Sequence, residues 1–177
     1  MKATGIVRRI DDLGRVVVPK EIRRTLRIRE GDPLEIFVDR EGEVILKKYS
    51  PINELGEFAD EYAQALFDSL GQRVLISDRD EYIAIAGASK REYLHKSVGK
   101  VVEDSMNSRE SKVEKNETTV ELVQGNEETV GAYLIHPIVS NGDPVGSVVL
   151  MMEKGPLTEV EIKVCHAAAN FLARQME

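Results

Sequence analysis

The sequence predicts a mixed α+β protein in two parts: a small β-rich domain over residues 1–50, then a larger domain of alternating strands and helices. Charge separates the two parts. Residues 1–29 carry nine Lys and Arg against three Asp and Glu, whereas residues 51–177 carry 12 basic and 22 acidic residues. Hydrophobic patterning also changes, because short β-branched runs give way to apolar positions at three- and four-residue steps. A basic end on an acidic chain indicates a nucleic-acid or other anionic partner at that end.

The bulk composition is that of a globular protein. The 177 residues are 42% hydrophobic and 31% charged, which suits one large domain or two small ones. No apolar run approaches the roughly 18 residues that a membrane helix needs, and the N-terminus lacks the apolar stretch of a signal peptide. Cys165 is the single cysteine, so no intrachain disulfide can form. We therefore expect a cytoplasmic protein with no membrane partner.

The N-terminal domain is expected to contain four short strands and one helix. Pro19 is expected to open the helix, because its fixed φ suits the first helical position, and Ile22 and Leu26 stand four apart as its buried stripe. The strands are predicted at 6–10, 15–18, 34–38 and 44–46, and the helix at 19–26. A turn is predicted from Asp11 to Gly14 between the first two strands, and a hairpin turn at residues 40–42 between the last two. Such a unit holds little apolar volume and is marginally stable alone. Pairing with a second copy is therefore expected to stabilise it.

A connecting helix is predicted over residues 51–71, followed by a regulatory domain over 72–177. Ser50 resembles an N-cap, and Gly71 closes the helix. Within the second domain, Asn141-Gly142 is a strong hairpin signal between strands, and Thr158 with Glu161 forms a capping box that opens a last helix. Further strands are predicted at 73–77, 82–86, 118–123, 132–140 and 145–152, with polar helices over 89–108 and an exposed loop over 109–117.

Arginines dominate the basic domain. A guanidinium group can hold a phosphate or a guanine edge in bidentate fashion, so these side chains are the candidate DNA contacts. On the predicted helix, Arg23 and Arg27 are expected to share a face, with Arg24 about 100° away. The alternative is that some arginines pair with nearby acids, namely Asp11, Asp12, Glu21 and Glu30. The candidates are Arg8, Arg9, Arg15, Arg23, Arg24 and Arg27.

The stretch from Thr4 to Leu26, together with Leu46 to Tyr49, resembles the swapped-hairpin DNA-binding domain of the AbrB family of bacterial transition-state regulators. The resemblance implies a dimeric, interleaved β-barrel in which two chains exchange hairpins on double-stranded DNA. It also implies a regulator that activates some sporulation genes and represses others. The DNA contacts implied by the family are Arg8, Arg15, Arg23 and Arg24, and the position of Arg9 varies more within the family.

The roughly 125 residues that follow resemble a GAF sensor domain, which implies a central antiparallel sheet flanked by helices. Such folds hold a small molecule between sheet and helices, so the resemblance leaves open an effector whose class no residue indicates. The segment 86–117 would border that cavity. The resemblance also implies homotetramers joined through the helices of 53–70 and 158–176. Polar candidates near the cavity are Ser89, Lys90, Arg91 and Tyr93.

No enzyme constellation is found in the sequence. His95, His136 and His166 lie far apart with no metal-ligand spacing, and Cys165 is expected to be a small buried hydrophobe. No phosphate loop, paired-cysteine zinc motif or nucleophile elbow occurs, so no catalytic residue, metal or cofactor is assigned. Two alternatives remain open: an antitoxin-like interaction protein with a disordered tail, which the apolar periodicity of 51–177 disfavours, and a metabolite-sensing enzyme subunit.

Overall fold

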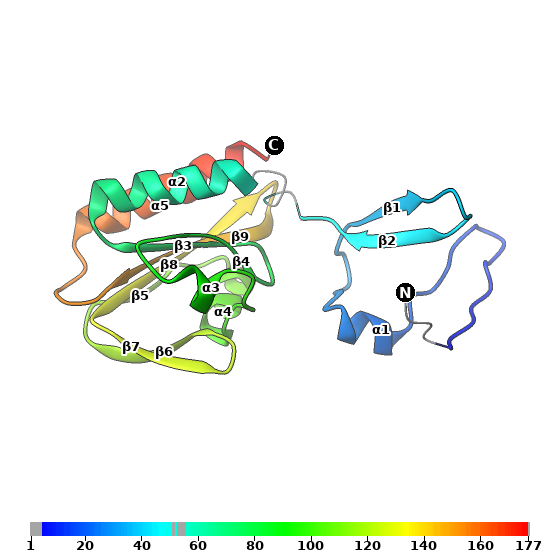
Figure 1. Cartoon of the computed structure of the whole chain (residues 1–177), viewed down its shortest axis with the longest axis horizontal. Coiled ribbons are helices and arrows are strands. Elements are labelled where there is room, and N and C mark those ends of the chain that lie inside the picture. Colours follow the sequence, from blue (N-terminus) through cyan, green and yellow to red (C-terminus); the bar gives the residue numbers. More distant parts are fainter. Residues whose placement is uncertain (1–4, 51, 53–55, 177) are drawn as a thin grey trace. The chain divides into compact units, whose positions relative to one another are not determined.

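The computed structural model describes residues 5–50, 52 and 56–176 (Figure 1). The chain divides into two compact units, Met1–Tyr49 and Ser50–Glu177. The predicted start of the connecting helix falls partly on residues 51 and 53–55, which lie outside the described residues. Each unit is described separately below.

The first unit contains one short helix and one hairpin. Helix α1 covers Lys20–Thr25, and strands β1 (Leu34–Val38) and β2 (Val44–Lys48) pair antiparallel with Leu34 opposite Lys48. The connecting turn is held by Asp39, whose Oδ1 accepts the backbone N–H groups of Glu41 and Glu43 at 3.0 and 2.9 Å. The predicted helix and the second predicted hairpin are therefore confirmed.

The predicted strands at 6–10 and 15–18 do not form within the single chain. No strand occurs among described residues 5–18, although a turn links the two segments. A strand needs a neighbouring strand to pair with its N–H and C=O groups. A run of β-branched residues favours the extended conformation but does not provide that neighbour. The predicted buried stripe of α1 is also wrong: the helix has no buried residue, and Leu26 is 57% exposed.

The second unit is built on one five-stranded antiparallel sheet of order β4-β3-β9-β8-β5. Helices α2 (Gly56–Leu70) and α5 (Glu159–Arg174) cover one face. Helices α3 (Lys90–Tyr93) and α4 (Lys100–Ser108) and the β6-β7 hairpin (Thr118–Val123 and Asn126–Val130) cover the other (Figure 1). The sheet strands are β3 (Arg73–Ser77), β4 (Tyr82–Ala86), β5 (Lys112–Glu114), β8 (Ala132–Ser140) and β9 (Asp143–Met152).

Strand alternation divides the core into two layers. Val148 and Leu150 pack toward α2 and α5, whereas Val149 between them packs toward α4 and the β6-β7 hairpin. The hairpin at Asn141-Gly142 is confirmed, and Asn141 has the positive φ of 50° that this turn requires. The loop predicted over 109–117 instead contains β5, a polar edge strand paired with β8. Ile52 is fully buried in the α2–α5 layer and anchors the start of this unit.

Candidate nucleic-acid interface

The first group of candidate arginines surrounds a tight turn at residues 11–15. The Gly14 N–H donates to the Asp11 carbonyl at 3.0 Å, and the Asp11 N–H donates to the Arg15 carbonyl at 3.0 Å. Gly14 has a φ of +77°, a conformation that residues with a side chain rarely adopt. This is a three-residue hairpin loop with glycine at the left-handed position, so the turn predicted from Asp11 to Gly14 is confirmed.

The carboxylate of Asp11 holds this turn together. Its Oδ1 accepts the N–H groups of Leu13 and Arg15 at 3.0 and 2.7 Å, and its Oδ2 accepts Nε of Arg15 at 2.8 Å. The hydrogen bonds from Arg15 lower the pKa of Asp11. One of the acidic pairings left open by the sequence is therefore real, but it is a surface pair: the Arg15 side chain is 69% exposed and that of Asp11 37%.

The segments on either side of the turn present the other arginines of this group. Arg8 and Arg9 are exposed on the segment before the turn, and neither pairs with a described carboxylate. The neighbouring apolar side chains are exposed too, with Val7 at 86% and Val17 at 71%. Cationic and apolar groups thus lie close together on segments that form no strand among the described residues.

Arg23 and Arg24 lie on α1. Pro19 precedes the helix and is buried, and the N–H of Arg23 donates to its carbonyl at 2.9 Å. Arg24 is exposed, whereas Arg23 is half-buried and its Nε is buried without a hydrogen-bond partner among the described residues. A buried donor left unpaired costs about 1–3 kcal/mol, so an acceptor from outside the described residues would stabilise this nitrogen.

Arg27 does not share a helical face with Arg23, which corrects the prediction. The helix ends at Thr25, and Arg27 has a left-handed backbone with φ 53°. The N–H of Ile28 donates to the Arg23 carbonyl at 2.8 Å and that of Arg27 to the Arg24 carbonyl at 3.4 Å, which is the Schellman pattern of a helix end. The sequence missed this end because glycine, its usual marker, is absent.

Lys48 has a structural role that no sequence pattern indicated. Its Nζ donates to the Arg27 carbonyl at 3.2 Å and lies 3.3 Å from Oδ2 of Asp32, whose side chain is fully buried. The same oxygen of Asp32 accepts the Arg29 N–H at 2.8 Å. Lys48 therefore fixes the segment after α1 against β2. Because these partners are about 20 residues apart, no local motif reveals them.

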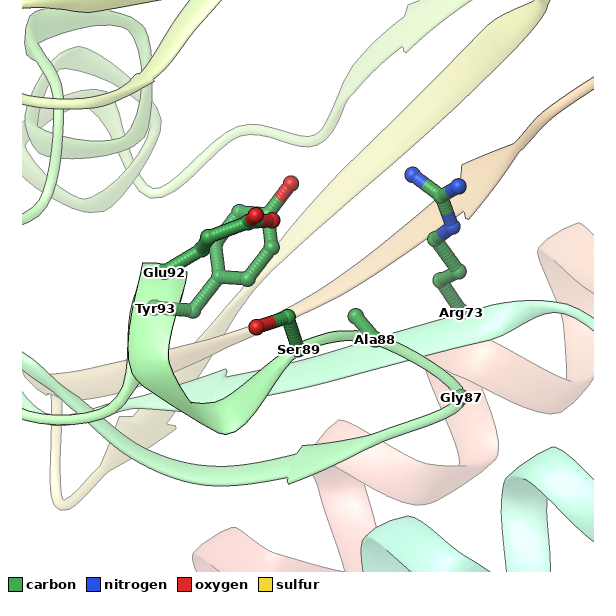
Figure 2. A pocket seen from close by; sticks show the side chains of 6 residues that line it. All are labelled: Arg73, Gly87, Ala88, Ser89, Glu92 and Tyr93. Carbon is green, nitrogen blue, oxygen red and sulfur yellow. The ribbon is translucent and has the colours of Figure 1, made fainter.

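The second unit has a polar hollow of about 310 Å³ beside α3, lined by Arg73, Gly87, Ala88, Ser89, Glu92 and Tyr93. Figure 2 shows Arg73 on one side of it and Glu92 and Tyr93 on the other. Arg73 pairs with Glu153. The Tyr93 hydroxyl donates to Glu128 at 2.6 Å, and burial raises the pKa of Tyr93.

Two of the four polar candidates from the sequence, Ser89 and Tyr93, therefore line this hollow. Lys90 pairs instead with Asp60 at 3.2 Å, beside a more open hollow along α2, and Arg91 is exposed. Arg73 was missed because strands distant in the sequence bring it there. Between the sheet and α4 the space is filled by apolar side chains such as Leu122 and Val102.

Two histidines that are 30 positions apart in sequence meet in the second unit. The rings of His136 on β8 and His166 on α5 have centroids 4.6 Å apart, and the Ser111 hydroxyl hydrogen-bonds Nδ1 of His136. Burial first, and His166 second, lower the pKa of His136 to about 4. Among the described residues no cluster of three or more metal-ligating side chains forms. Cys165 is fully buried, and burial raises the pKa of its thiol to about 12.

Within the described part of the chain, no helix combines the length and apolar character needed to cross a bilayer. The sequence family described as stage V sporulation protein T C-terminal, transcription factor, matches residues 54–177. Residues 7–54 match the family described as antidote-toxin recognition MazE, bacterial antitoxin.

Individual relatives agree with both matches. The chain is 64% identical over 177 residues to stage V sporulation protein T of Bacillus subtilis (strain 168), covering all of this chain and 99% of that protein. Over 51 residues it is 67% identical to the transition state regulatory protein AbrB of the same organism, covering 29% of this chain and 52% of AbrB.

A solved structure shows the fold of the second unit. The GAF domain of an Acinetobacter phosphoenolpyruvate-protein phosphotransferase superimposes with a TM-score of 0.58 at 16% identity, covering 69% of this chain and 81% of that one. The C-terminal unit therefore has a GAF-like fold, and the N-terminal domain is AbrB-like in sequence. The chain belongs to the stage V sporulation protein T family of transcription factors.

Proposed function

We propose that this protein is a DNA-binding regulator that activates some sporulation genes and represses others, acting on the nucleoid in the cytoplasm. Arg8, Arg15, Arg23 and Arg24 would contact double-stranded DNA, with Arg9 in a lesser role. The observation that carries the proposal is a basic unit whose arginines reach solvent from a turn and a short helix. Membership in a family of transcription factors supports it, and the proposal needs no catalytic residue.

The DNA-binding form is proposed to be a dimer with exchanged hairpins. Between residues 5 and 49 only Pro19 is buried, while twelve large hydrophobic side chains are exposed. Segments 5–10 and 15–18 carry several exposed apolar side chains but form no strand among the described residues. A second copy would pair with the backbone N–H and C=O groups of these segments. It would also shield their apolar side chains from water. Pairing also doubles the arginine surface.

The proposed recognition is electrostatic docking followed by shape selection. Each arginine that neutralises a phosphate releases counterions, so affinity falls steeply with salt. Helix α1 has only six residues and cannot serve as a long recognition helix. Specificity is therefore expected to come partly from the shape and deformability of the duplex.

Arginine substitutions in the full chain test this assignment. Arg24→Ala is expected to lower affinity for a promoter fragment about 10-fold or more in moderate salt, measured by fluorescence anisotropy. Arg40→Ala is the matched control, because it removes the same charge from an exposed side chain in the β1–β2 turn. Equal binding by Arg24→Ala and the wild-type protein, with circular dichroism unchanged, would reject the site.

We infer that α2 and α5 join dimers into tetramers. Phe58, Tyr62 and Phe171 stack with ring centroids 5.3–6.0 Å apart, and Phe171 remains 41% exposed. Phe171→Asp is expected to halve the mass measured by light scattering. Val113→Asp, on a side chain that is 40% exposed on β5, should leave the mass unchanged. An unaltered mass for Phe171→Asp would exclude this interface.

A regulatory small molecule is proposed to bind the hollow between Arg73 and Tyr93. Its volume is at the lower end of the roughly 300–1,000 Å³ typical of ligand sites. Ser89→Trp would fill it, whereas Arg91→Trp places the same bulk on α3 outside the lining. A metabolite that raises the melting temperature of the wild-type protein and of Arg91→Trp, but not of Ser89→Trp, would bind there. Equal shifts in all three would place the ligand elsewhere.

The antitoxin-like alternative is not favoured. The antitoxin family matches only residues 7–54. Beyond them the chain forms a compact unit with a two-layer core, whereas the alternative requires a disordered partner-binding tail. Protease resistance of that unit in solution would test the difference.

A further inference from the structure

We propose that Asp11 is a positioning residue for Arg15, and that it sets sequence discrimination at the cost of overall DNA affinity. The inference rests on the proposed DNA contact by Arg15. It predicts something that contact alone does not: removing a carboxylate next to the contact should strengthen binding to unrelated DNA and weaken the preference for the correct site.

The geometry assigns the two oxygens of Asp11 to different tasks. Oδ1 accepts the N–H groups of Leu13 and Arg15 and so shapes the turn. Oδ2 accepts Nε of Arg15 at 2.8 Å, which holds the guanidinium group by its inner nitrogen. No other hydrogen bond or ion pair of the Arg15 side chain occurs among the described residues, and the side chain is 69% exposed. Its two terminal nitrogens are left for a ligand.

A fixed guanidinium plane favours discrimination. Two parallel donors match the O6 and N7 acceptors of guanine, or two phosphate oxygens, only when the plane has the right orientation. A freely rotating arginine finds a phosphate on any duplex and loses more side-chain freedom when it binds. When Asp11 holds Nε of Arg15, the two terminal nitrogens have a fixed orientation. Binding is then favoured only for DNA whose bases and phosphates fit that orientation.

The same carboxylate weakens binding to every duplex. Asp11 places a negative charge beside a group that meets a polyanion, and like charges at close range repel. The hydrogen bonds from Arg15 lower its pKa, so the repulsion persists at neutral pH. The two effects of Asp11 thus have opposite signs on specific and on unrelated DNA. A residue that only stabilised the fold would lower both affinities together.

Asp12 provides a matched control in the same turn. It is the next residue and is exposed, and it forms no hydrogen bond or ion pair with another described residue. Asp12→Asn therefore removes one negative charge from the turn without releasing Arg15. Asp11→Asn removes the same charge and weakens the hold on Nε, but keeps an amide oxygen that can accept the backbone N–H groups of the turn.

The experiment uses the full chain and two duplexes: a site enriched from random sequence by the wild-type protein, and an unrelated sequence of equal length. Affinities are measured by anisotropy over a range of salt. Both variants are expected to bind unrelated DNA about 2- to 3-fold more tightly, with a salt slope steeper by about 1. Asp11→Asn alone is expected to lose about 10-fold in the ratio of enriched to unrelated affinity. Equal ratios for the two variants would overturn the proposal.

Arg15→Lys is a second test that leaves the Asp11 carboxylate, and therefore the turn, unchanged, so misfolding of Asp11→Asn cannot explain its result. It keeps the charge and the intact carboxylate but has no Nε and no fork, so it should bind unrelated DNA like the wild-type protein and lose discrimination as Asp11→Asn does. In an Arg15→Ala background, Asp11→Asn should not change the ratio further. Wild-type discrimination by Arg15→Lys would contradict the proposal. Wild-type affinity of Arg15→Ala would instead reject the proposed function, so the two failures are distinguishable.

Discussion

The two units of this chain use their hydrophobic residues in opposite ways. Between residues 5 and 49, twelve large hydrophobic side chains are exposed and Pro19 alone is buried, whereas residues 56–176 expose only three. The second unit closes its own core on both faces of one sheet. The second unit is therefore stabilised within one chain, whereas the first leaves an apolar surface that the second copy of the proposed dimer would cover.

The first unit is organised by polar contacts where the second is organised by an apolar core. In the first unit, local carboxylates organise turns: Asp11 and Asp39 each accept two backbone N–H groups, and buried Asp32 pairs with Lys48. These contacts set the shape of segments without a core to support them. They give the exposed surface a defined form, so the basic unit combines a very small core with specific local geometry.

The largest effect is expected where a charge enters the surface that a second copy would cover in the proposed dimer. Val17→Asp would bury an unpaired carboxylate between two chains, which costs about 3–5 kcal/mol. DNA affinity should fall at least about 100-fold, and amide protection should be lost over residues 5–49 in hydrogen exchange. Val17→Thr, which keeps the β-branched shape, should retain binding. Wild-type DNA affinity for Val17→Asp would show that this face is not covered.

A substitution in the second unit should act within one chain. Leu150 is fully buried in the layer under α2 and α5. Leu150→Ala is expected to lower the free energy of unfolding of this unit by about 2–5 kcal/mol, measured by urea titration. The exposed Val160 provides the control, since Val160→Ala should change stability by less than about 0.5 kcal/mol. Similar losses from both would remove the contrast between core and surface.

Features with a local cause were predictable from the sequence. The Asn141-Gly142 hairpin and the capping box at Thr158 depend on neighbouring residues, and both form as predicted. The charge asymmetry and the turn at Asp11 also follow from adjacent residues. The arginine candidates came from charge and side-chain chemistry, and the family resemblance selected four of them as DNA contacts. The structure adds the contact of Arg15 with Asp11 and the burial of the Arg23 Nε.

Features that depend on distant or external partners were not predictable. The segment 6–10 has the composition of a strand, but no strand forms among described residues 5–18, so composition alone predicted the wrong state for a single chain. Strand β5 was missed because an edge strand faces water and has no apolar alternation. The meeting of His136 with His166, and that of Arg73 with Tyr93 around one hollow, require strand pairings that no single segment encodes.

Acid is expected to weaken the second unit through His136. Burial and His166 lower its pKa from 6.5 to about 4, so the folded state favours the neutral ring. The unfolded chain binds the proton more readily between these values, and stability should fall as the pH drops from about 6.5 to 4. We expect a loss of about 1–2 kcal/mol, less than the full shift because the ring is only half-buried.

The measurement is thermal unfolding of the full chain across this pH range, compared with His136→Leu. The variant should show a flatter dependence, because the proton-binding difference between folded and unfolded states is removed. An unchanged slope in His136→Leu would assign the acid sensitivity to other groups. Amide protection in the first unit should not follow the same profile, since His136 belongs to the second.

The smallest effect concerns how helices begin in the two units. Helix α5 is capped by its own side chains: the Val160 N–H donates to the Thr158 hydroxyl at 3.3 Å, and Glu161 accepts the Thr158 N–H at 2.8 Å. Helix α1 starts after Pro19, which has no capping side chain. Thr158→Ala should lower the stability of the second unit by about 1 kcal/mol, and Thr158→Ser should restore most of it. Calorimetry of the two variants would detect the difference, and a silent Thr158→Ala would show that packing against the sheet alone fixes the start of α5. Helix α1 has neither a capping side chain nor a buried residue, so fewer contacts within the chain fix its start than fix the start of α5.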